Sequence, residues 1–487
     1  MPLLRPAALG AAVLAATVLS PLPGAGPAGA APAERWHRQL PGAWLYWSSP
    51  VLADVDGVGG NDVVVGGLNG LVYALDPAGN PLPGWPARAT AAVASSPAVG
   101  DLDGDGTSEV VTGVGSLEVP NQRGAINIFN HDGSRRCVFE TNPDHGETAV
   151  FNAPALGDVD GDGTKDVVFG SFDQRIRVIN HRCQPLGSFD HADSLFSAPA
   201  LADVDGDGDQ EIFIGGDASR GPAGQSHDGG TFRSLDYRAG ATHPDGHVNL
   251  VQRWSREDSR ETFQSAAAIG NLDGDAGLEV VTGSGAYWCR RKNQCADSDK
   301  VWAFNAEDGS TVAGWPRSVT FNTTFLSAPA LGDLDGDGTT DVVVGSNHYT
   351  NTNPAGGALE AFYGNGGHRR WENDLEIMAS PVIADVDGAA GNEVVIGASR
   401  QVFVLDGHLG VLQAGLAKDI DHKSAAVVGE YGPGRFALVS AGFDAFPGRN
   451  NEGHVVAYDI AAPKSAPWPM HRKNSHRAGA EIIDPVP

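Results

Sequence analysis

The sequence predicts an all-β protein built as a single ring of four-stranded sheets, and three observations lead to this prediction. An acidic nonapeptide, Asp-x-Asp-Gly-Asp-Gly-x-x-(Asp/Glu), recurs along the 487 residues. Short apolar runs separated by Gly, Pro and Asp surround each copy and predict four strands per unit. The first residues of successive copies are between 45 (203 − 158) and 68 (271 − 203) residues apart. Four short strands at this period are typical of the blades of a β-propeller.

The first segment of the chain, residues 1–30, is predicted to lie outside this fold. Arg5 gives a positive start, and Ala7–Leu19 is an apolar run that is too short to span a bilayer. Ala28–Ala30 offers a small-residue cleavage site. These are the features of a secretory signal peptide, so we expect a secreted, extracellular protein.

The acidic loops come next and are predicted to bind calcium between the first two strands of most blades. In the copy that starts at Asp333, oxygens at positions 1, 3 and 5 face one concavity, Gly338 at position 6 permits the turn, and Asp341 at position 9 closes the shell. Calcium takes six to eight hard oxygen ligands, which this spacing supplies. The predicted ligands of the five nearly complete copies are Asp101, Asp103, Asp105, Glu109; Asp158, Asp160, Asp162, Asp166; Asp203, Asp205, Asp207, Glu211; Asn271, Asp273, Asp275, Glu279; and Asp333, Asp335, Asp337, Asp341.

Two further copies lack the acid at position 5, where Val58 and Ala389 stand. They are expected to bind calcium weakly or only to turn the chain. Their remaining acids are Asp54, Asp56, Asp62 and Asp385, Asp387, Glu393. Asp-Gly turns without any metal are common in hairpins, which is the competing interpretation of every copy. Because five copies share the same spacing of ligand residues, calcium binding is favoured over turns without metal.

An eighth, degenerate copy decides the predicted number of blades. Ser424–Gly442 aligns without gaps on Ser327–Gly345, but it has lost the loop acids. We predict that 454–458 and Trp468–Met470 supply its third and fourth strands. The propeller is therefore predicted over residues 48–473 with eight blades, and seven is the alternative. Residues 31–47 are expected to help close the ring, and 474–487 to form a tail.

The four cysteines agree with an oxidising compartment. Cys289 and Cys295 flank a short basic segment and are predicted to form a local disulfide. Cys137 and Cys183 occupy similar places in neighbouring repeats, so a second disulfide is predicted between those repeats.

The composition limits the classes of partner that this protein is expected to bind. The formal net charge of −27 argues against nucleic acid, because phosphate recognition needs a basic surface. No segment after the leader is apolar for long enough to form a transmembrane helix. The oligomeric state is open.

The signature Ala328–Gly345, Ala-Pro-Ala-Leu-Gly-Asp-Leu-Asp-Gly-Asp-Gly-Thr-Thr-Asp-Val-Val-Val-Gly, resembles the FG-GAP repeats of the integrin α-subunit N-terminal propeller and the related VCBS repeats of bacterial proteins. The resemblance covers nearly all of the chain after the leader. It implies a calcium-binding β-propeller, but no particular ligand. Unlike the adhesion receptors, this sequence shows no membrane segment, stalk or inserted domain.

A ligand is expected on the face opposite the acidic loops, where the long connections between second and third strands emerge. Aromatic and basic residues on rigidly held loops suit recognition of an extracellular glycan or protein. The candidate ligand-face residues are Tyr287, Trp288, His348, Tyr349 and Arg449. The main hypothesis is a binding or adhesion module.

Two alternatives are a polysaccharide-degrading, lyase-like enzyme on the same scaffold and a purely structural protein of the cell surface. No catalytic residues are predicted, because the sequence contains none of the common hydrolase or metalloprotease motifs.

Overall fold

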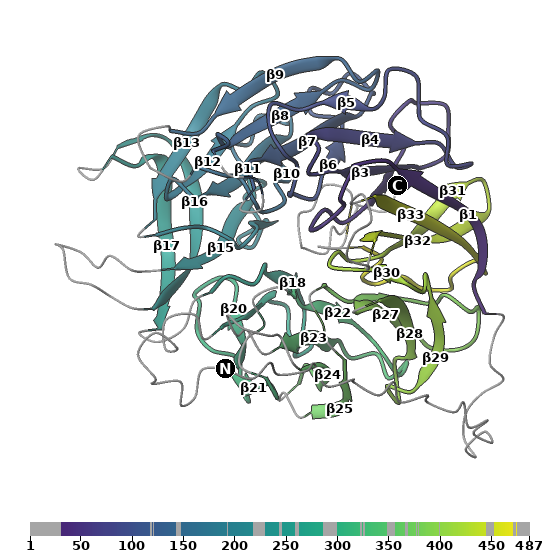
Figure 1. The fold of residues 1–487 in the computed structure, drawn as a ribbon. Helices are drawn as coiled ribbons and strands as arrows, with labels where there is room; N and C mark the ends of the chain where they lie inside the picture. The colour runs from purple at the N-terminus through teal and green to yellow at the C-terminus, as the bar shows by residue number, and fades with distance from the viewer. Residues whose placement is uncertain are drawn as a thin grey trace, which may run out of the picture.

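In the computed structural model, every regular element among the described residues is a β-strand. The structure describes residues 31–470 and 474, apart from 117–118, 120, 143–147, 192, 218–228, 243–245, 259–262, 286–299, 322–323, 325–326, 348–355, 366–368, 376, 378, 399 and 445–451. The strands form antiparallel sheets that stand around a central axis like the blades of a propeller (Figure 1). Within these ranges, no helix has the length and hydropathy needed to cross a membrane.

Five sheets contain four strands each, hydrogen-bonded in chain order. Their strands are β2 (Val51–Ala53), β3 (Asp62–Gly66), β4 (Leu71–Leu75) and β5 (Ala87–Arg88); β6 (Ala98–Gly100), β7 (Glu109–Val114), β8 (Ala125–Phe129) and β9 (Arg135–Glu140); β18 (Ala268–Gly270), β19 (Glu279–Gly283), β20 (Lys300–Asn305) and β21 (Arg317–Ser318); β22 (Ala330–Gly332), β23 (Asp341–Asn347), β24 (Gly357–Tyr363) and β25 (Arg369–Asp374); and β26 (Val382–Ala384), β27 (Glu393–Ala398), β28 (Gln401–Asp406) and β29 (Leu412–Leu416).

An eight-stranded sheet consists of two four-stranded antiparallel halves. The halves contain β10 (Ala155–Gly157), β11 (Asp166–Ser171), β12 (Arg175–Ile179) and β13 (Pro185–Asp190); and β14 (Ala200–Ala202), β15 (Glu211–Asp217), β16 (Gly230–Thr242) and β17 (Val248–Asp258). A single parallel pair, Ser188 with Asn249, joins the outer strands β13 and β17. The join is local, so each half keeps the strand order of the other four-stranded sheets.

The last sheet contains both ends of the described chain. It holds β30 (Ile420–Asp421), β31 (Val427–Gly432), β32 (Arg435–Asp444), β33 (Gly453–Ile460) and β1 (Ala33–Leu40). The N-terminal strand β1 pairs antiparallel with β33, from Ala33 opposite Asp459 to Leu40 opposite Gly453. The N-terminal strand β1 is therefore the outer strand of a sheet whose other strands come from the C-terminal part of the chain.

The prediction that Trp468–Met470 forms that outer strand is wrong. Trp468 bridges Ile383 of β26, and Met470 bridges Val427 of β31, so the segment lies beside two first strands near the axis. Trp468 is 1% exposed there. The outer position is already taken by β1, and the apolar Trp468 side chain gains more burial between two sheets than at the rim.

Burial decreases from the axis to the rim. The second strands, such as β3 and β11, are buried at every residue, which explains their continuous apolar runs. Outer strands such as β9 have no fully buried residue. The apolar clusters join neighbouring sheets, as where Ile128 of β8 packs with Leu156 of β10, so the core lies between the blades.

In four repeats, a serine just before the first strand forms a hydrogen bond with a glycine near the end of the second strand. The serine Oγ accepts the glycine N–H at 2.9 to 3.4 Å, in the pairs Ser48–Gly66, Ser95–Gly113, Ser197–Gly215 and Ser327–Gly345. A Cβ on Gly66 would lie 2.3 Å from Val93 Cγ1 of the neighbouring sheet. Glycine therefore ends the apolar run because the next sheet approaches the backbone too closely for a side chain.

Tryptophans link neighbouring sheets at the rim. Five indole N–H groups each donate to a backbone carbonyl in the turn between the third and fourth strands of the next sheet. The pairs are Trp36–Pro77, Trp85–His131, Trp254–Ala306, Trp315–Gly364 and Trp371–Gly407. Between β9 and the β12–β13 turn, the predicted Cys137–Cys183 disulfide takes this place, with its Cα atoms 6.0 Å apart. The other predicted disulfide, Cys289–Cys295, lies outside the described residues.

Candidate functional site

The acidic loops connect the first and second strands of seven sheets or half-sheets, and the acid at position 9 is always the first residue of the second strand. These closing acids are almost completely buried, with exposures of 0 to 3%. They are Asp62, Glu109, Asp166, Glu211, Glu279, Asp341 and Glu393. The start of a second strand therefore fixes one carboxylate at the base of each loop.

One oxygen of each closing acid accepts the backbone N–H of the residue at position 2. The seven distances lie between 2.6 and 3.2 Å, and the donors are Val55, Leu102, Val159, Val204, Leu272, Leu334 and Val386. Since this bond uses only one oxygen, the second oxygen remains available to face the loop.

The first acid organises the turn. Asp101 Oδ1 accepts the N–H of Gly104 at 2.8 Å, and its Oδ2 accepts that of Gly106 at 2.9 Å. Both glycines have positive φ, 74° and 86°, which explains the Gly-x-Gly spacing. Asn271 keeps the first of these bonds, but its Nδ2 donates to Asp275 O instead of accepting the second.

Three carboxylates converge in each of five loops. Oxygens of positions 1, 3 and 9 lie within 4.8 Å of one another in the loops that start at Asp54, Asp101, Asp158 and Asp203. In the loop that starts at Asn271, which lacks the first acid, Asp273, Asp275 and Glu279 do so. The position-5 acids of three loops instead accept the N–H and hydroxyl of the Thr two residues later, as Asp105 does from Thr107. Positions 1, 3 and 9 therefore converge in four of these loops, whereas positions 3, 5 and 9 converge in the loop of Asn271.

Several of these oxygens are buried without a hydrogen-bond partner. They are Asp103 Oδ1, Asp158 Oδ1, Glu279 Oε1 and Asp341 Oδ1. A buried carboxylate oxygen without a donor or cation is unfavourable. Converging hard oxygens of this kind fit a divalent cation such as calcium.

Burial is the largest cause that raises the pKa of the closing acids, and neighbouring carboxylates add to it. The pKa is raised to about 8 for Asp166, and to about 7 for Asp62, Glu211, Glu279, Asp341 and Glu393. Without a bound cation, ionisation of all the carboxylates of one loop is therefore unfavourable.

The two incomplete loops differ from each other. Asp54, Asp56 and Asp62 still converge, although Val58 is 81% exposed in place of the acid. In the loop that starts at Asp385, the Lys464 ammonium donates to the carbonyls of Gly388 and Ala389 at 2.8 and 3.0 Å. A lysine from the C-terminal segment thus lies beside the position where the acid is missing.

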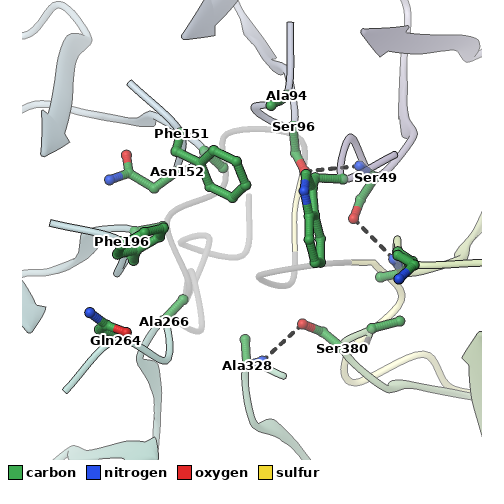
Figure 2. Close-up of a pocket in the computed structure, with 16 residues that line it drawn as sticks. Ser49, Ala94, Ser96, Phe151, Asn152, Phe196, Gln264, Ala266, Ala328 and Ser380 are labelled. Carbon is green, nitrogen blue, oxygen red and sulfur yellow. Dashed lines mark hydrogen bonds between the residues drawn. The ribbon is translucent and has the colours of Figure 1, made fainter. Parts of the chain in front are cut away.

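A second candidate site lies on the axis (Figure 2). It is a pocket lined by the residue that stands two places before the first strand in every repeat. These residues are small: Ser49, Ser96, Ala153, Ala198, Ala266, Ala328, Ser380 and Ala425. Neighbours are linked around the ring, as where Ser49 Oγ accepts Ala425 N–H and Ser380 Oγ accepts Ala328 N–H.

Larger side chains from two residues earlier in the repeats also line this pocket. Trp47, Phe151 and Phe196 form a chain of rings, with centroid distances of 5.9 and 5.7 Å. Lys423 Nζ lies 4.9 and 5.8 Å from the ring centroids of Tyr46 and Trp47. Because the acidic loops follow the first strands and these residues precede them, the pocket lies at the opposite end of those strands.

Asn152 adds a polar group to the pocket. Its Nδ2 donates to Gly170 O and Leu195 O, which leaves its buried Oδ1 without a partner. The pocket residues were not predicted from the sequence. The available signal was the residue two places before the lead-in Ser or Ala, which varies from Ala94 to Gln264, Lys423 and aromatic side chains while the lead-in itself stays small. The predicted ligand-face residues Tyr287, Trp288, His348, Tyr349 and Arg449 lie outside the described residues.

Comparison with known proteins identifies the repeat and the fold. The FG-GAP repeat model matches residues 325–359. No curated protein matches the chain. Three similar solved structures are the V. cholerae biofilm matrix protein Bap1 (TM-score 0.57, 15% identity, covering 91% of this chain and 92% of that one), BamB from Moraxella catarrhalis (0.53, 14%, 88% and 98%) and the exotype rhamnogalacturonan lyase YesX (0.53, 14%, 91% and 77%).

At these identities the likeness concerns the fold alone. The repeat match, the sheets arranged around an axis and the similar structures agree with one another. The chain therefore contains an FG-GAP repeat, matched at residues 325–359, and has a β-propeller fold.

Proposed function

We propose that this protein is a secreted, calcium-stabilised propeller that binds an extracellular glycan or protein through its axial pocket. The observation that carries the proposal is the pocket itself, where Trp47, Phe151 and Phe196 surround small residues on a rigid ring. Secretion is supported by the leader-like residues 1–30.

The proposed role of calcium is structural. The closing acid and the acids at positions 1 and 3 would hold the ion, as in the loop of Asp158, Asp160 and Asp166. Bound calcium supplies the positive charge that these converging oxygens lack. The loop then ties the first strand to the second at the end of the sheet away from the pocket, which stabilises the blade that positions the pocket residues.

We further propose that the ring has eight blades. The support is that the pocket is lined by one small residue from each of eight repeats, from Ser49 to Ala425. The strand β1 would complete the eighth blade by its pairing with β33, which covers the otherwise unpaired edge of β33.

The chemistry of the pocket suits a ligand with both apolar and polar groups. Aromatic faces stack on sugar rings or on side chains. Lys423 would favour a ligand with an acidic group at the rim of the pocket, although the chain as a whole is acidic.

The test is a glycan array and a panel of extracellular protein extracts, probed with the protein without residues 1–30, in calcium and in chelator. We expect binding in calcium, with a loss of about fivefold or more in affinity for Trp47→Ala, since removing one stacked ring costs at least about 1 kcal/mol. Leu412→Ala, which truncates a 54% exposed side chain of the outer strand β29, is the control. Equal binding by wild type and Trp47→Ala would refute the proposed site.

A lyase-like enzyme is the second candidate, and Lys423 is the observation that favours it. A lysine is one of the side chains that can act as a general base toward a bound substrate. Release of unsaturated sugars from an acidic polysaccharide, lost in Lys423→Gln, would support this candidate. A structural protein of the cell surface remains if folded protein binds nothing and releases nothing.

A further inference from the structure

Three acidic loops receive an arginine from the outer strand of their own sheet. Arg136 Nη1 lies 2.7 Å from Glu109 Oε1, and its Nη2 contacts Asp103. The guanidinium therefore bridges the acids at positions 3 and 9 of the loop that starts at Asp101.

The same bridge is repeated twice. Arg253 Nη1 lies 2.6 Å from Asp205 Oδ2 and 3.1 Å from Glu211 Oε1. In the next case, Arg370 contacts Asp335 at 2.5 Å and Asp341 at 2.6 Å.

A β-bulge directs each of these arginines. Arg136 is the extra residue between the pairs Phe129–Arg135 and Ile128–Cys137. Arg253 and Arg370 are the extra residues at the corresponding register shifts of β17 and β25. A bulge leaves one residue unpaired and re-aims its side chain, here toward the loop.

The same bulge exists in two sheets without arginine. Leu186 is the extra residue in β13, and Gln413 is the extra residue in β29. The loop of Asp158, which belongs to the sheet with Leu186, therefore has four acids and no arginine from that strand. The loop of Asn271 also has no arginine among its described contacts, and Glu279 Oε1 is fully buried there without a partner.

We propose that Arg136, Arg253 and Arg370 are built-in cations that replace much of the calcium requirement in their loops, so that calcium binds most tightly to the loops of Asp158 and Asn271. The inference rests on the proposed calcium binding and assigns its strength loop by loop. A guanidinium in contact with two of the ligand carboxylates repels a divalent ion and uses their charge. Asp103 Oδ1 and Asp341 Oδ1 still have no partner, so those loops retain weaker binding.

The sheets of the ring should therefore differ in how strongly they depend on calcium. Sheets with an arginine keep their loops paired when calcium is scarce. The sheets with Asp158 and Asn271 depend on the ion, and they lie on either side of the half-sheet that carries Arg253.

The experiment measures calcium bound per chain over a range of free calcium, by equilibrium dialysis, for the wild type, Arg253→Leu and Leu186→Arg. We expect the wild type to show tight and weak classes that differ by about tenfold or more in affinity. Arg253→Leu should move one ion from the weak class to the tight class, and Leu186→Arg should remove one ion from the tight class. Leu186→Met is the matched control and should leave both classes unchanged.

Melting in chelator gives an independent readout. Arg253→Leu should melt lower than the wild type in chelator and recover in calcium. Calcium binding by the wild type with unchanged classes in both variants would overturn this inference alone. No calcium binding by the wild type or by any variant would overturn both the inference and the proposed structural role of calcium.

Discussion

Replacement of Asp166 by Asn should stabilise the calcium-free protein at neutral pH. Asp166 is 1% exposed and lies among Asp158, Asp160 and Asp162, and burial followed by the charge of Asp160 raises its pKa to about 8. In the unfolded chain the same carboxyl ionises near its ordinary value of 3.8. An asparagine keeps an oxygen that can accept the N–H of Val159 but carries no charge.

The sign and size of the effect follow from the two pKa values. Between them, the folded protein holds one proton more than the unfolded chain, so its stability falls as pH rises. One such proton changes the free energy of unfolding by about 1.4 kcal/mol per pH unit, or about 2.7 kcal/mol between about pH 5 and pH 7. Asp166→Asn should remove this contribution, and the other closing acids should maintain the remaining slope.

The assay is denaturant unfolding in chelator at several pH values between about 5 and 7. Asp132→Asn is the control, because Asp132 is exposed and its lowered pKa keeps it ionised over this range. An equal dependence on pH in the wild type and Asp166→Asn would refute the assignment of the buried proton to Asp166. Calcium should remove much of the slope in the wild type, because it binds the ionised carboxylate.

Three other predictions concern the links between sheets. Replacing both Cys137 and Cys183 by Ala removes a bridge across 46 residues and should lower the free energy of unfolding by about 4 kcal/mol, measured by denaturant unfolding against the oxidised wild type. Trp254→Phe keeps the ring but removes the hydrogen bond to Ala306 O, so it should cost about 1 kcal/mol, and no change in the midpoint would contradict the proposed link. Deletion of residues 33–40 exposes the edge of β33 and should cause self-association, which light scattering would detect.

The sequence was most informative where function and local structure use the same residues. The spacing of Asp333, Gly338 and Asp341 predicted a loop that leads directly into a strand, and the closing acid does begin β23. Position 5 was less predictable, because Asp337 accepts the backbone N–H and the hydroxyl of its neighbour Thr339.

The missed features depend on contacts that no local pattern encodes. Arg370 is 29 residues from Asp341, and only a bulge in β25 brings the two together. Phe151 and Lys423 line the same pocket although 272 residues (423 − 151) separate them. Such neighbours become visible only when the ring is formed.

The pairing of β1 with β33 also sets an order of folding events. Most of the other sheets can form from consecutive chain, whereas this contact joins Ala33 to Asp459, 426 residues (459 − 33) away. Closing so long a loop in an unfolded chain costs about 2 kcal/mol more entropy than closing one of about 50 residues. The pairing of β1 with β33 should therefore form last, after the other sheets have packed together and brought the two ends of the chain close to each other. Until then β33 presents an unpaired edge, and a slow final step would be the moment when the chain is most exposed to proteases and to other copies of itself.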